Sequence, residues 1–407
     1  MRKTLYLFFV SILLMVFILE GCSKQKDSHT EDSENENMYA SHQSKMTKDW
    51  QTYDGEIYHI FYHPLITDAK VAFSGSPQEA KGNNDWMITA NEFKKSLEEL
   101  HKRNYILINP HDAYDLKAKT INKKKLKLPK GKKPLILSID DMNYYEYMRG
   151  KGYADRLVLD KNKHVVSETK RKNGKVTHSK DDDIVPILND FVKKHPDFSL
   201  NGQKGVVALT GYNGVLGYRT NEIDSKHYKD RKAKATKVAD AMKRDGWTFA
   251  SHSYGHINFE QSSFEGIVKD TKRWEKEVTP IIGKTDLFIF PHGAQDRDTP
   301  AYNYLIKEGH FKYLAGVGPN NFTDVEPDNV YQDRVAVDGL NLYEFKDKLK
   351  PFMNPEKVYD KHDRSYFRGN KDYQQEERFD NKMKLYEFFT FDLLDTSAAA
   401  EDLGRFE

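Results

Sequence analysis

The sequence has almost no cysteine, no strong excess of either charge and no long apolar run after its first residues. A single cysteine among 407 residues excludes an internal disulfide framework and any cysteine-rich metal site. The 64 Lys and Arg residues against 62 Asp and Glu residues leave a net charge of +2, which gives no general case for nucleic-acid binding. With 38% hydrophobic and 31% charged residues, a multi-span membrane protein is also excluded.

Aromatic residues, in contrast, are plentiful. The chain contains 23 Phe, 24 Tyr and 4 Trp, which is enough apolar surface to build a core, so a low-complexity disordered chain is excluded. The length fits one large domain of catalytic size together with accessory segments.

The amino terminus predicts export from the cytoplasm. Arg2 and Lys3 form a short positive region, and an apolar run of 15 residues from Leu5 to Leu19 follows, interrupted only by Ser11. This run is short for a membrane span and has the length of a secretory signal core.

The only cysteine, Cys22, closes the sequence Leu-Glu-Gly-Cys directly after this run. The segment resembles the lipobox of bacterial lipoproteins, in which the cysteine is lipid-modified and becomes the mature amino terminus. The alternative is an uncleaved signal anchor with an incidental cysteine. We therefore expect a signal peptide over residues 1–21, a lipid anchor at Cys22, a flexible polar tether over residues 22–49, and a location on the extracytoplasmic face of the cell membrane.

Apolar strands and helices alternate between residues 50 and 350. Strands are expected at 57–63, 105–108, 135–139, 205–209, 247–251 and 287–290, and helices at 89–103, 184–194, 232–244, 264–278 and 301–308. This alternation predicts an α/β architecture with a parallel sheet.

Two segments depart from the alternation. Residues 143–182 are polar and contain short apolar runs around an Asn173-Gly174 turn, which predicts a β-hairpin insertion. Residues 351–407 are charged and aromatic. We expect them to be a C-terminal extension that either wraps the domain or forms a short helical tail.

Adjacent carboxylates follow the expected strand at 135–139. Asp140 and Asp141 stand side by side there, and neighbouring carboxylates repel each other unless a cation or a shared proton relieves them. The alternative is an ordinary turn or helix cap, because aspartate is common at both.

Two histidines follow the expected strand at 247–251. His252 and His256 are four residues apart and can face one metal ion through their imidazole nitrogens. The spacing alone is weak support, because His59 and His63 share it and residues four apart in a strand also point to one face.

A third polar turn follows the strand at 287–290. Pro291 and His292 lie there, where backbone amides can face a ligand. A tight loop after a buried strand is the alternative.

The three segments are more specific together than singly. Each lies just beyond an apolar strand, and the carboxyl ends of parallel strands are where α/β barrels keep their active sites. One aspartate and two histidines supply three metal ligands and leave positions for water and substrate. A second aspartate beside them supplies a base for that water.

At these motifs the sequence resembles the polysaccharide deacetylases with the NodB homology domain, also called carbohydrate esterase family 4. Their first motif, Thr-Phe-Asp-Asp, corresponds to residues 138–141, and their second, His-Ser/Thr-x-x-His, corresponds to residues 252–256. The resemblance implies an α/β fold over residues 50–350, a distorted (β/α) barrel. It further implies that Asp140 is the general base.

The resemblance also implies a metal site. Asp141, His252 and His256 are the implied ligands of a divalent ion, with zinc expected and cobalt or nickel as alternatives. The third family motif, Arg-x-Pro-Tyr/Phe, is matched at Pro291, whereas His292 takes the aromatic place. The implied role of this segment is to face the substrate and its oxyanion.

Three departures from the family pattern stand out. Ile289 replaces the arginine that orients the base in the family, and Met142 replaces a glycine. The late Leu-x-His motif, whose histidine usually serves as general acid, is missing. Some members resemble a circularly permuted barrel with a Tyr-His strand before the aspartate pair. Tyr62-His63 fits that pattern, so His63 is the expected general acid.

The implied activity is metal-dependent removal of N-acetyl groups from a cell-surface polysaccharide, either peptidoglycan or poly-N-acetylglucosamine. The expected partners are an N-acetylated glycan and the membrane through the lipid anchor, and no nucleic acid. The main alternative is a non-catalytic glycan-binding lipoprotein on a decayed deacetylase scaffold. A solute-binding lipoprotein is a further alternative, and an O-acetyl esterase would share all the same residues.

Overall fold

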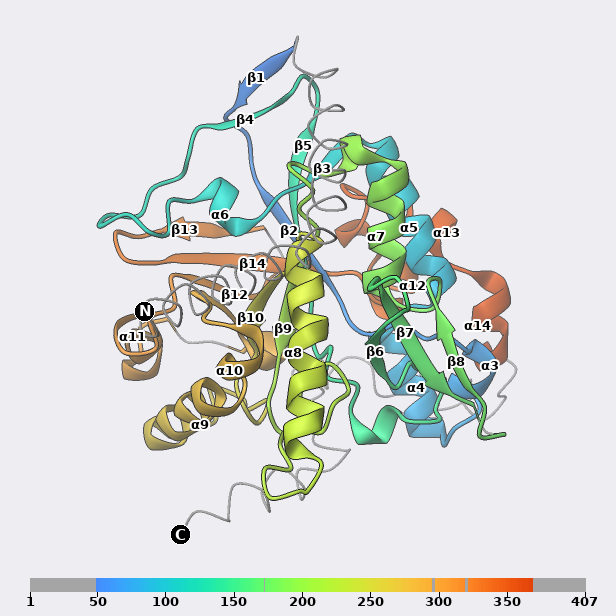
Figure 1. Cartoon of the computed structure of the whole chain (residues 1–407). Coiled ribbons are helices and arrows are strands. Elements are labelled where there is room, and N and C mark those ends of the chain that lie inside the picture. The colour runs from blue at the N-terminus through green and yellow to red at the C-terminus, as the bar shows by residue number, and fades with distance from the viewer. Residues whose placement is uncertain (1–48, 172, 295–296, 319–320, 369–407) are drawn as a thin grey trace, which may run out of the picture. The chain divides into compact units, whose positions relative to one another are not determined.

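The structure is a computed structural model that describes residues 49–171, 173–294, 297–318 and 321–368 (Figure 1). The expected signal peptide, Cys22, nearly all of the expected tether and residues 369–407 lie outside the described residues. Within the described part of the chain, the helices are too short or too polar to cross a bilayer.

Seven parallel strands of the described residues close into a barrel. In barrel order they are β2 (Tyr58–Tyr62), β5 (Lys133–Ile139), β9 (Val206–Leu209), β10 (Thr248–Ser251), β11 (Leu287–Ile289), β12 (Tyr313–Val317) and β14 (Val330–Ala336). Strand β14 pairs in parallel with both β12 and β2, which closes the ring. The predicted α/β fold, a distorted (β/α) barrel, is confirmed.

The distortion lies in uneven pairing. Strands β10 and β11 share a single pair of register partners, Ser251 and Phe288, and β5 pairs with three neighbours because β3 (Tyr105–Leu107) adds to its edge. Strand β13 (Thr323–Val325) joins β14 in the antiparallel sense.

The interior of the barrel contains branched and small side chains. Five different strands each contribute one side chain to a single buried cluster: Ile136, Ala208, Ala250, Ile289 and Ala315. Such side chains fill the centre of a barrel as a packed core rather than a pore. Ile289 is therefore a core residue.

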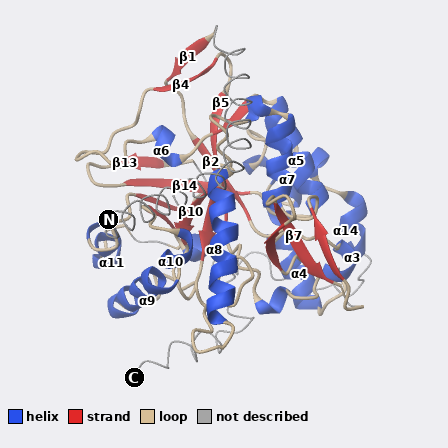
Figure 2. Ribbon diagram, in the orientation of Figure 1, coloured by secondary structure: helices blue, strands red, loops and turns tan. Residues whose placement is uncertain are grey.

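Helices flank the strands (Figure 2). They are α3 (Ala69–Ala72), α4 (Pro77–Trp86), α5 (Ala90–Lys102), α6 (Pro110–Ala113), α7 (Ile184–Lys194), α8 (Tyr228–Arg244), α9 (Phe264–Glu277), α10 (Thr279–Ile282), α11 (Pro300–Lys307), α12 (Gly339–Tyr343), α13 (Pro355–Val358) and α14 (Lys361–Arg368). Helix α5 begins at a capping box, in which Thr89 and Glu92 each accept a hydrogen bond from the other's backbone N–H.

The insertion after the first motif has one strand more than the predicted hairpin. Strands β6 (Arg156–Leu159), β7 (Val165–Lys170) and β8 (Val176–Ser179) form an antiparallel sheet. The third strand escaped the sequence analysis because β8 is polar and largely exposed, so it lacks the apolar alternation of a half-buried strand.

The described start of the C-terminal extension packs against the domain. The guanidinium of Arg364 in α14 is fully buried and donates to both carboxylate oxygens of Glu92, at 3.0 and 2.8 Å. Residues 361–368 are thus attached to the start of α5. At the opposite end of the described chain, β1 (Trp50–Tyr53) pairs with β4 (Leu126–Pro129).

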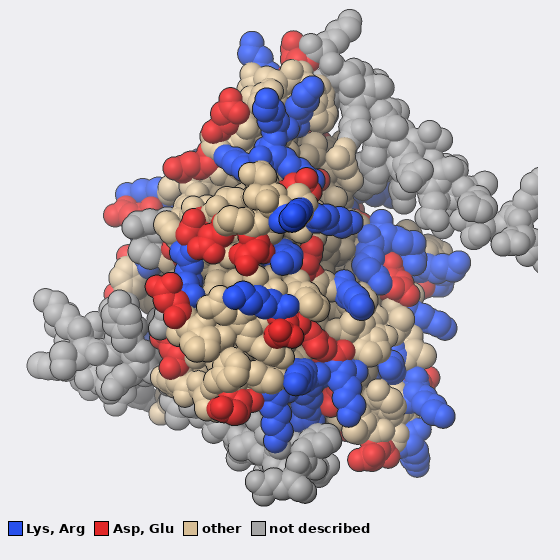
Figure 3. Space-filling view, turned by 90° about the vertical axis from the view of Figure 1, so that its left-hand side faces the viewer, with Lys and Arg blue, Asp and Glu red and all other residues tan. Residues whose placement is uncertain are grey.

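Charges of both signs are mixed on the surface. On the face drawn in Figure 3, Lys and Arg side chains lie among Asp and Glu side chains, so the small net charge of +2 arises from mixed charges rather than from an uncharged surface.

Candidate active site

The loops after β5 and β10 bring three potential metal ligands together. One ligand atom from each of Asp141, His252 and His256 lies within 4.8 Å of the other two. Asp141 Oδ2 lies 3.6 Å from His256 Nε2, and Asp141 Oδ1 lies 4.0 Å from His252 Nε2. Two imidazoles and one carboxylate form a donor set that suits zinc and similar divalent ions.

A hydrogen bond orients His252 toward this centre. Its Nδ1 lies 2.8 Å from the carbonyl oxygen of Ile289, which can only accept, so Nδ1 carries the proton and Nε2 presents a lone pair. Metal-ligating histidines are commonly fixed through such an outer hydrogen bond. The residue in the place of the family arginine thus contributes its backbone carbonyl to the site.

The protonation states suit metal binding. Burial alone would raise the pKa of Asp141, but the nearby His256, His252 and His63, with a hydrogen bond from Tyr145, hold it at about 2. Burial lowers the pKa of His256 to about 3. Near neutral pH the carboxylate is therefore ionised and this imidazole neutral, which are the forms that bind metal.

Strained backbone gathers at this centre. Positive φ angles of 60°, 57°, 55° and 59° occur at Asp141, Ser253, His256 and His292, respectively. Residues other than glycine rarely adopt this left-handed conformation, and it persists where the surrounding structure enforces it, often at functional sites.

One buried carboxylate holds the second motif in this conformation. Asp270 of α9 accepts hydrogen bonds from the backbone N–H groups of Tyr254 and Gly255, both at 2.7 Å. Burial raises the pKa of Asp270 to about 6 despite these bonds. The sequence analysis missed Asp270, because nothing in the pattern of α9 marks one of its acids as facing this loop.

Asp140 is gripped by an arginine that the sequence analysis also missed. Arg334 Nη1 and Nη2 lie 2.7 and 2.9 Å from the two carboxylate oxygens of Asp140, a bidentate geometry. Both side chains are almost fully buried. Burial alone would raise the pKa of Asp140, but Arg334 and the nearby histidines hold it below its usual value. A guanidinium from β14 thus orients the expected base, although Ile289 leaves none in the third motif.

The same arginine continues a buried polar chain. Its Nη1 donates to Ser138 Oγ at 3.1 Å, and Ser138 Oγ lies 2.8 Å from His59 Nε2. The other ring nitrogen of His59 lies 2.9 Å from the hydroxyl of Tyr313. His59 is fully buried in this chain, which is a structural position.

His63 stands at the end of β2 and is half-buried. Burial lowers its pKa, while the carboxylates of Asp140 and Asp141 oppose that shift and His252 adds to it. The expected general acid is therefore electrostatically coupled to Asp140, the expected base, and to two of the candidate metal ligands. Its catalytic role stays a prediction.

The third motif forms a short 3-10 turn at Pro291–Gly293. His292 Nε2 lies 3.1 Å from the carbonyl oxygen of His256, and the two rings are 4.4 Å apart between centroids. His292 thus contacts the candidate metal ligand His256. The expected substrate and oxyanion role of Pro291 and His292 stays a prediction.

A tyrosine hydroxyl holds the carboxylate of Asp141. The Tyr145 hydroxyl donates to Asp141 Oδ1 at 2.5 Å and lies 2.8 Å from Thr210 Oγ1. Its ring is stacked between Tyr147 and Tyr212, with centroids 5.5 and 4.9 Å away. Tyr145 therefore fixes the position of Asp141.

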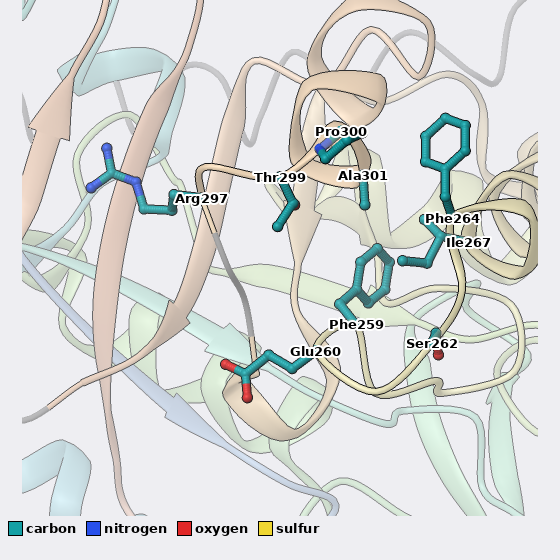
Figure 4. A pocket seen from close by; sticks show the side chains of 9 residues that line it. All are labelled: Phe259, Glu260, Ser262, Phe264, Ile267, Arg297, Thr299, Pro300 and Ala301. Atoms are coloured by element: carbon teal, nitrogen blue, oxygen red, sulfur yellow. The ribbon is translucent and has the colours of Figure 1, made fainter.

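A cavity of about 660 Å³ opens beside the second motif (Figure 4). It is lined by Phe259, Glu260, Ser262, Phe264, Ile267, Arg297, Thr299, Pro300 and Ala301. In Figure 4, Phe259, Ile267 and Phe264 gather on one side and Arg297 stands apart from them. One of its lining residues, Phe259, follows His256 by only three residues in the chain.

Comparisons with known proteins agree with the motifs. Residues 219–307 match the family model described as polysaccharide deacetylase, so the family expected from the sequence is confirmed over this segment, which includes the second and third motifs. No curated protein matches the chain.

Three solved structures are similar at low identity. The deacetylase PplD of Streptococcus pyogenes in complex with acetate has 13% identity and a TM-score of 0.42, covering 74% of this chain and 98% of that one. A putative polysaccharide deacetylase from Mycobacterium smegmatis has 14% identity and a TM-score of 0.26, covering 38% and 45%. A family 4 pseudoenzyme from Bacillus anthracis has 11% identity and a TM-score of 0.24, covering 41% and 55%.

Proposed function

We propose that this protein, whose residues 219–307 match the polysaccharide deacetylase family, is a metal-dependent hydrolase. It removes N-acetyl groups from a cell-surface polysaccharide, either peptidoglycan or poly-N-acetylglucosamine. One observation carries the proposal: an ionised Asp140, gripped by Arg334, stands next to the cluster of Asp141, His252 and His256.

The proposed cofactor is a divalent ion, zinc first and cobalt or nickel as alternatives. Asp141, His252 and His256 would hold it, since their ligand atoms converge and the protonation states of Asp141 and His256 suit binding. When bound, such an ion polarises the acetamide carbonyl and lowers the pKa of a bound water from about 15.7 toward about 7.

The side chains of this protein would move the protons. Asp140 accepts the proton of the attacking water at a carboxylate oxygen, while the fork of Arg334 keeps the carboxylate plane fixed. His63 gives a proton to the departing nitrogen as the carbon–nitrogen bond breaks. The products are acetate and a glucosamine residue with a free amino group, so one water is consumed for each acetyl group released.

The ion pair between Arg334 and Asp140 speaks against the decayed scaffold. Burying two charges has a large desolvation cost that only good geometry offsets, and a pure glycan binder has no use for a buried ionised base. The missing third-motif arginine is one of three features that favour that alternative, with Met142 and the missing late histidine, and Arg334 supplies a guanidinium to Asp140 from another strand.

The decisive experiment is metal-dependent acetate release. The mature chain is stripped with a chelator, reloaded with zinc, cobalt or nickel, and given N-acetylglucosamine oligomers, peptidoglycan fragments and an O-acetylated glycan. The proposal expects acetate from an N-acetylated substrate only after reloading. Release from the O-acetylated glycan alone would contradict it in favour of an esterase. Metal binding without any acetate would contradict it in favour of a binding scaffold.

We also propose that the chain is lipid-anchored through Cys22 on the extracytoplasmic face of the membrane. The support is the apolar run from Leu5 to Leu19, which is followed three residues later by Cys22, the only cysteine in the sequence. A Cys22→Ser variant should leave the membrane fraction, and the mature wild-type amino terminus should carry acyl chains by mass spectrometry. An intact Met1 on the membrane-bound protein would contradict the lipoprotein assignment.

A further inference from the structure

A second group of two histidines and one aspartate lies outside the candidate active site. His101 belongs to the last turn of α5, His195 caps the end of α7, and Asp197 follows in the 3-10 turn Pro196–Phe198. One ligand atom from each lies within 4.8 Å of the other two. The group therefore has the same side-chain chemistry as the first cluster.

This group is at the opposite end of the barrel. Helix α5 leads into the start of β3, and α7 leads through the 3-10 turn toward the start of β9. Asp140, Asp141 and His252, in contrast, follow the ends of parallel strands. The α5 and α7 helices pack against each other and lie side by side in Figure 1. In barrels, this amino-terminal end serves stability rather than catalysis.

The three side chains are close and accessible. His101 Nε2 lies 2.8 Å from Asp197 Oδ2, and the rings of His101 and His195 are 4.6 Å apart between centroids. Among the described residues, the imidazole of His195 has no hydrogen-bond partner, so both of its nitrogens are available. The side chains of His101 and Asp197 are 27% and 41% exposed, which lets an ion enter from solvent.

The surroundings hold the rings in place and favour a cation. Phe191 and Phe198 contact the ring of His101, with centroids 6.1 and 5.9 Å away. Helices α5 and α7 both end here, and the carbonyl end of a helix carries partial negative charge.

One charge opposes a cation. Lys132 Nζ lies 2.7 Å from the same carboxylate oxygen of Asp197 that faces His101, and its side chain is 10% exposed. A bound ion would have to share this carboxylate with Lys132. The ammonium therefore weakens cation binding, and removing it should strengthen binding.

We propose that His101, His195 and Asp197 form a second divalent-metal site, structural in role, that ties α5 to the end of α7. Two imidazoles and one carboxylate suit zinc, nickel or copper, whereas calcium and magnesium prefer sites made wholly of oxygen. The site is distinct from the one that the deacetylase proposal requires, so either can fail alone.

The test uses the full mature chain with the first cluster disabled by His252→Ala and His256→Ala. Zinc titration by calorimetry should then show one ion bound per chain, and cobalt should give a d–d absorption band. Adding His195→Asn should weaken zinc affinity by more than about ten-fold, because losing even a residue that only orients a metal ligand lowers metal affinity by about 10–100-fold. Adding Lys132→Met should act in the opposite direction and tighten binding.

A matched control is His178→Asn. His178 Nε2 lies 2.9 Å from Glu168 Oε2 on β7, a pair of the same kind that belongs to no three-residue group among the described residues. This substitution should leave zinc affinity unchanged. Far-ultraviolet circular dichroism and the melting temperature without metal verify that each variant is folded, and Asp197→Asn replaces His195→Asn if the latter is not.

Two results would overturn the proposal. One is a folded His252→Ala, His256→Ala chain that binds no zinc. The other is zinc binding that His195→Asn and Asp197→Asn leave unchanged. A rise in melting temperature with zinc that disappears in His195→Asn would support it, because an ion that binds only the folded state stabilises that state.

Discussion

The two ends of the barrel carry the same three ligand types in different settings. At the carboxyl end, Asp141 is ionised by surrounding histidines, fixed by Tyr145 and placed on strained backbone. At the amino end, Asp197 is half-exposed and shares its carboxylate with Lys132. The difference teaches that ligand identity alone does not make a reactive site. Asp140 and the arginine that grips it lie beside the first cluster, whereas among the described residues neither His101 nor Asp197 has an arginine partner.

The strongest way to test this contrast is to neutralise the base. Asp140→Asn keeps the shape of the side chain but cannot accept a proton, so acetate release should fall by about 10²–10⁴-fold. Zinc affinity should change little, because Asp140 belongs to neither metal cluster. Acetate release and zinc calorimetry on one preparation measure both effects. His178→Asn, whose side chain belongs to neither metal cluster, is the control and should leave turnover unchanged. Full activity in Asp140→Asn would contradict the assignment of Asp140 as the base.

Removing the arginine should have the next largest effect. Arg334→Lys keeps one charge but loses the fork that grips both oxygens of Asp140, so we expect turnover to fall by about 10²-fold while KM and zinc affinity change less. Steady-state kinetics separate the two parameters. A rise in KM with unchanged kcat would show that Arg334 binds substrate and does not position the base. Lys312→Arg, directly before the neighbouring strand β12, also exchanges one cationic side chain for another and is the control that should leave turnover unchanged.

A smaller effect is expected where only the support of a ligand is removed. Tyr145→Phe deletes the hydroxyl that donates to Asp141 and leaves the stacked ring in place, so zinc affinity should fall by about 10-fold. Tyr144→Phe removes the neighbouring hydroxyl, which donates to Asp183 instead, and should leave zinc affinity unchanged. Equal zinc affinities of Tyr145→Phe and wild type would show that Asp141 needs no such support.

The smallest expected effect concerns Asp338, a buried acid that accepts no hydrogen bond from a Lys or Arg side chain among the described residues. Burial raises the pKa of Asp338, the cap of α12, to about 7, although it accepts a hydrogen bond from Asn341 N. An acid whose pKa is raised on folding favours the folded state at low pH and loses that contribution as pH rises toward the folded pKa. Stability should therefore decline between about pH 4 and pH 7.

Asp338→Asn keeps the cap without the ionisation, since asparagine caps helices as well as aspartate. Its melting temperature should exceed that of wild type by a few degrees at pH 8 and by less at pH 5. The same difference at both pH values would contradict this account. Asp141, whose pKa is lowered to about 2, marks the opposite case of a buried acid compensated by its neighbours.

Much of the fold could be predicted because the apolar pattern within each segment indicates its secondary structure. The expected strand at 135–139 and the helices at 184–194 and 264–278 coincide with β5, α7 and α9 to within two residues, since each has a clear apolar period. The strands that close the barrel were missed. Strand β12 is a short apolar run interrupted by Gly316, and glycine is depleted in strands. Strand β14 has Gln332, Asp333 and Arg334 at its centre and therefore lacks the apolar pattern of a buried strand.

The candidate site divides in the same way. Asp141, His252 and His256 were predicted because each belongs to a short motif at the end of a recognisable strand. Arg334 and Asp270 were not, because their roles depend on contacts across the fold: 194 residues separate Arg334 from Asp140. The family pattern pointed to Ile289 for the arginine, and only the closed barrel shows that another strand supplies it.

The long separation between Asp140 and Arg334 also orders events in time. A chain synthesised amino terminus first contains all three proposed ligands of the first cluster, the last of them His256, before β14 is added. The base acquires its guanidinium only when β14 inserts between β12 and β2 and completes the ring. The ion pair between Asp140 and Arg334 is therefore a property of the finished barrel. A molecule whose β14 has not yet inserted would contain the three proposed ligands but lack the guanidinium that grips Asp140.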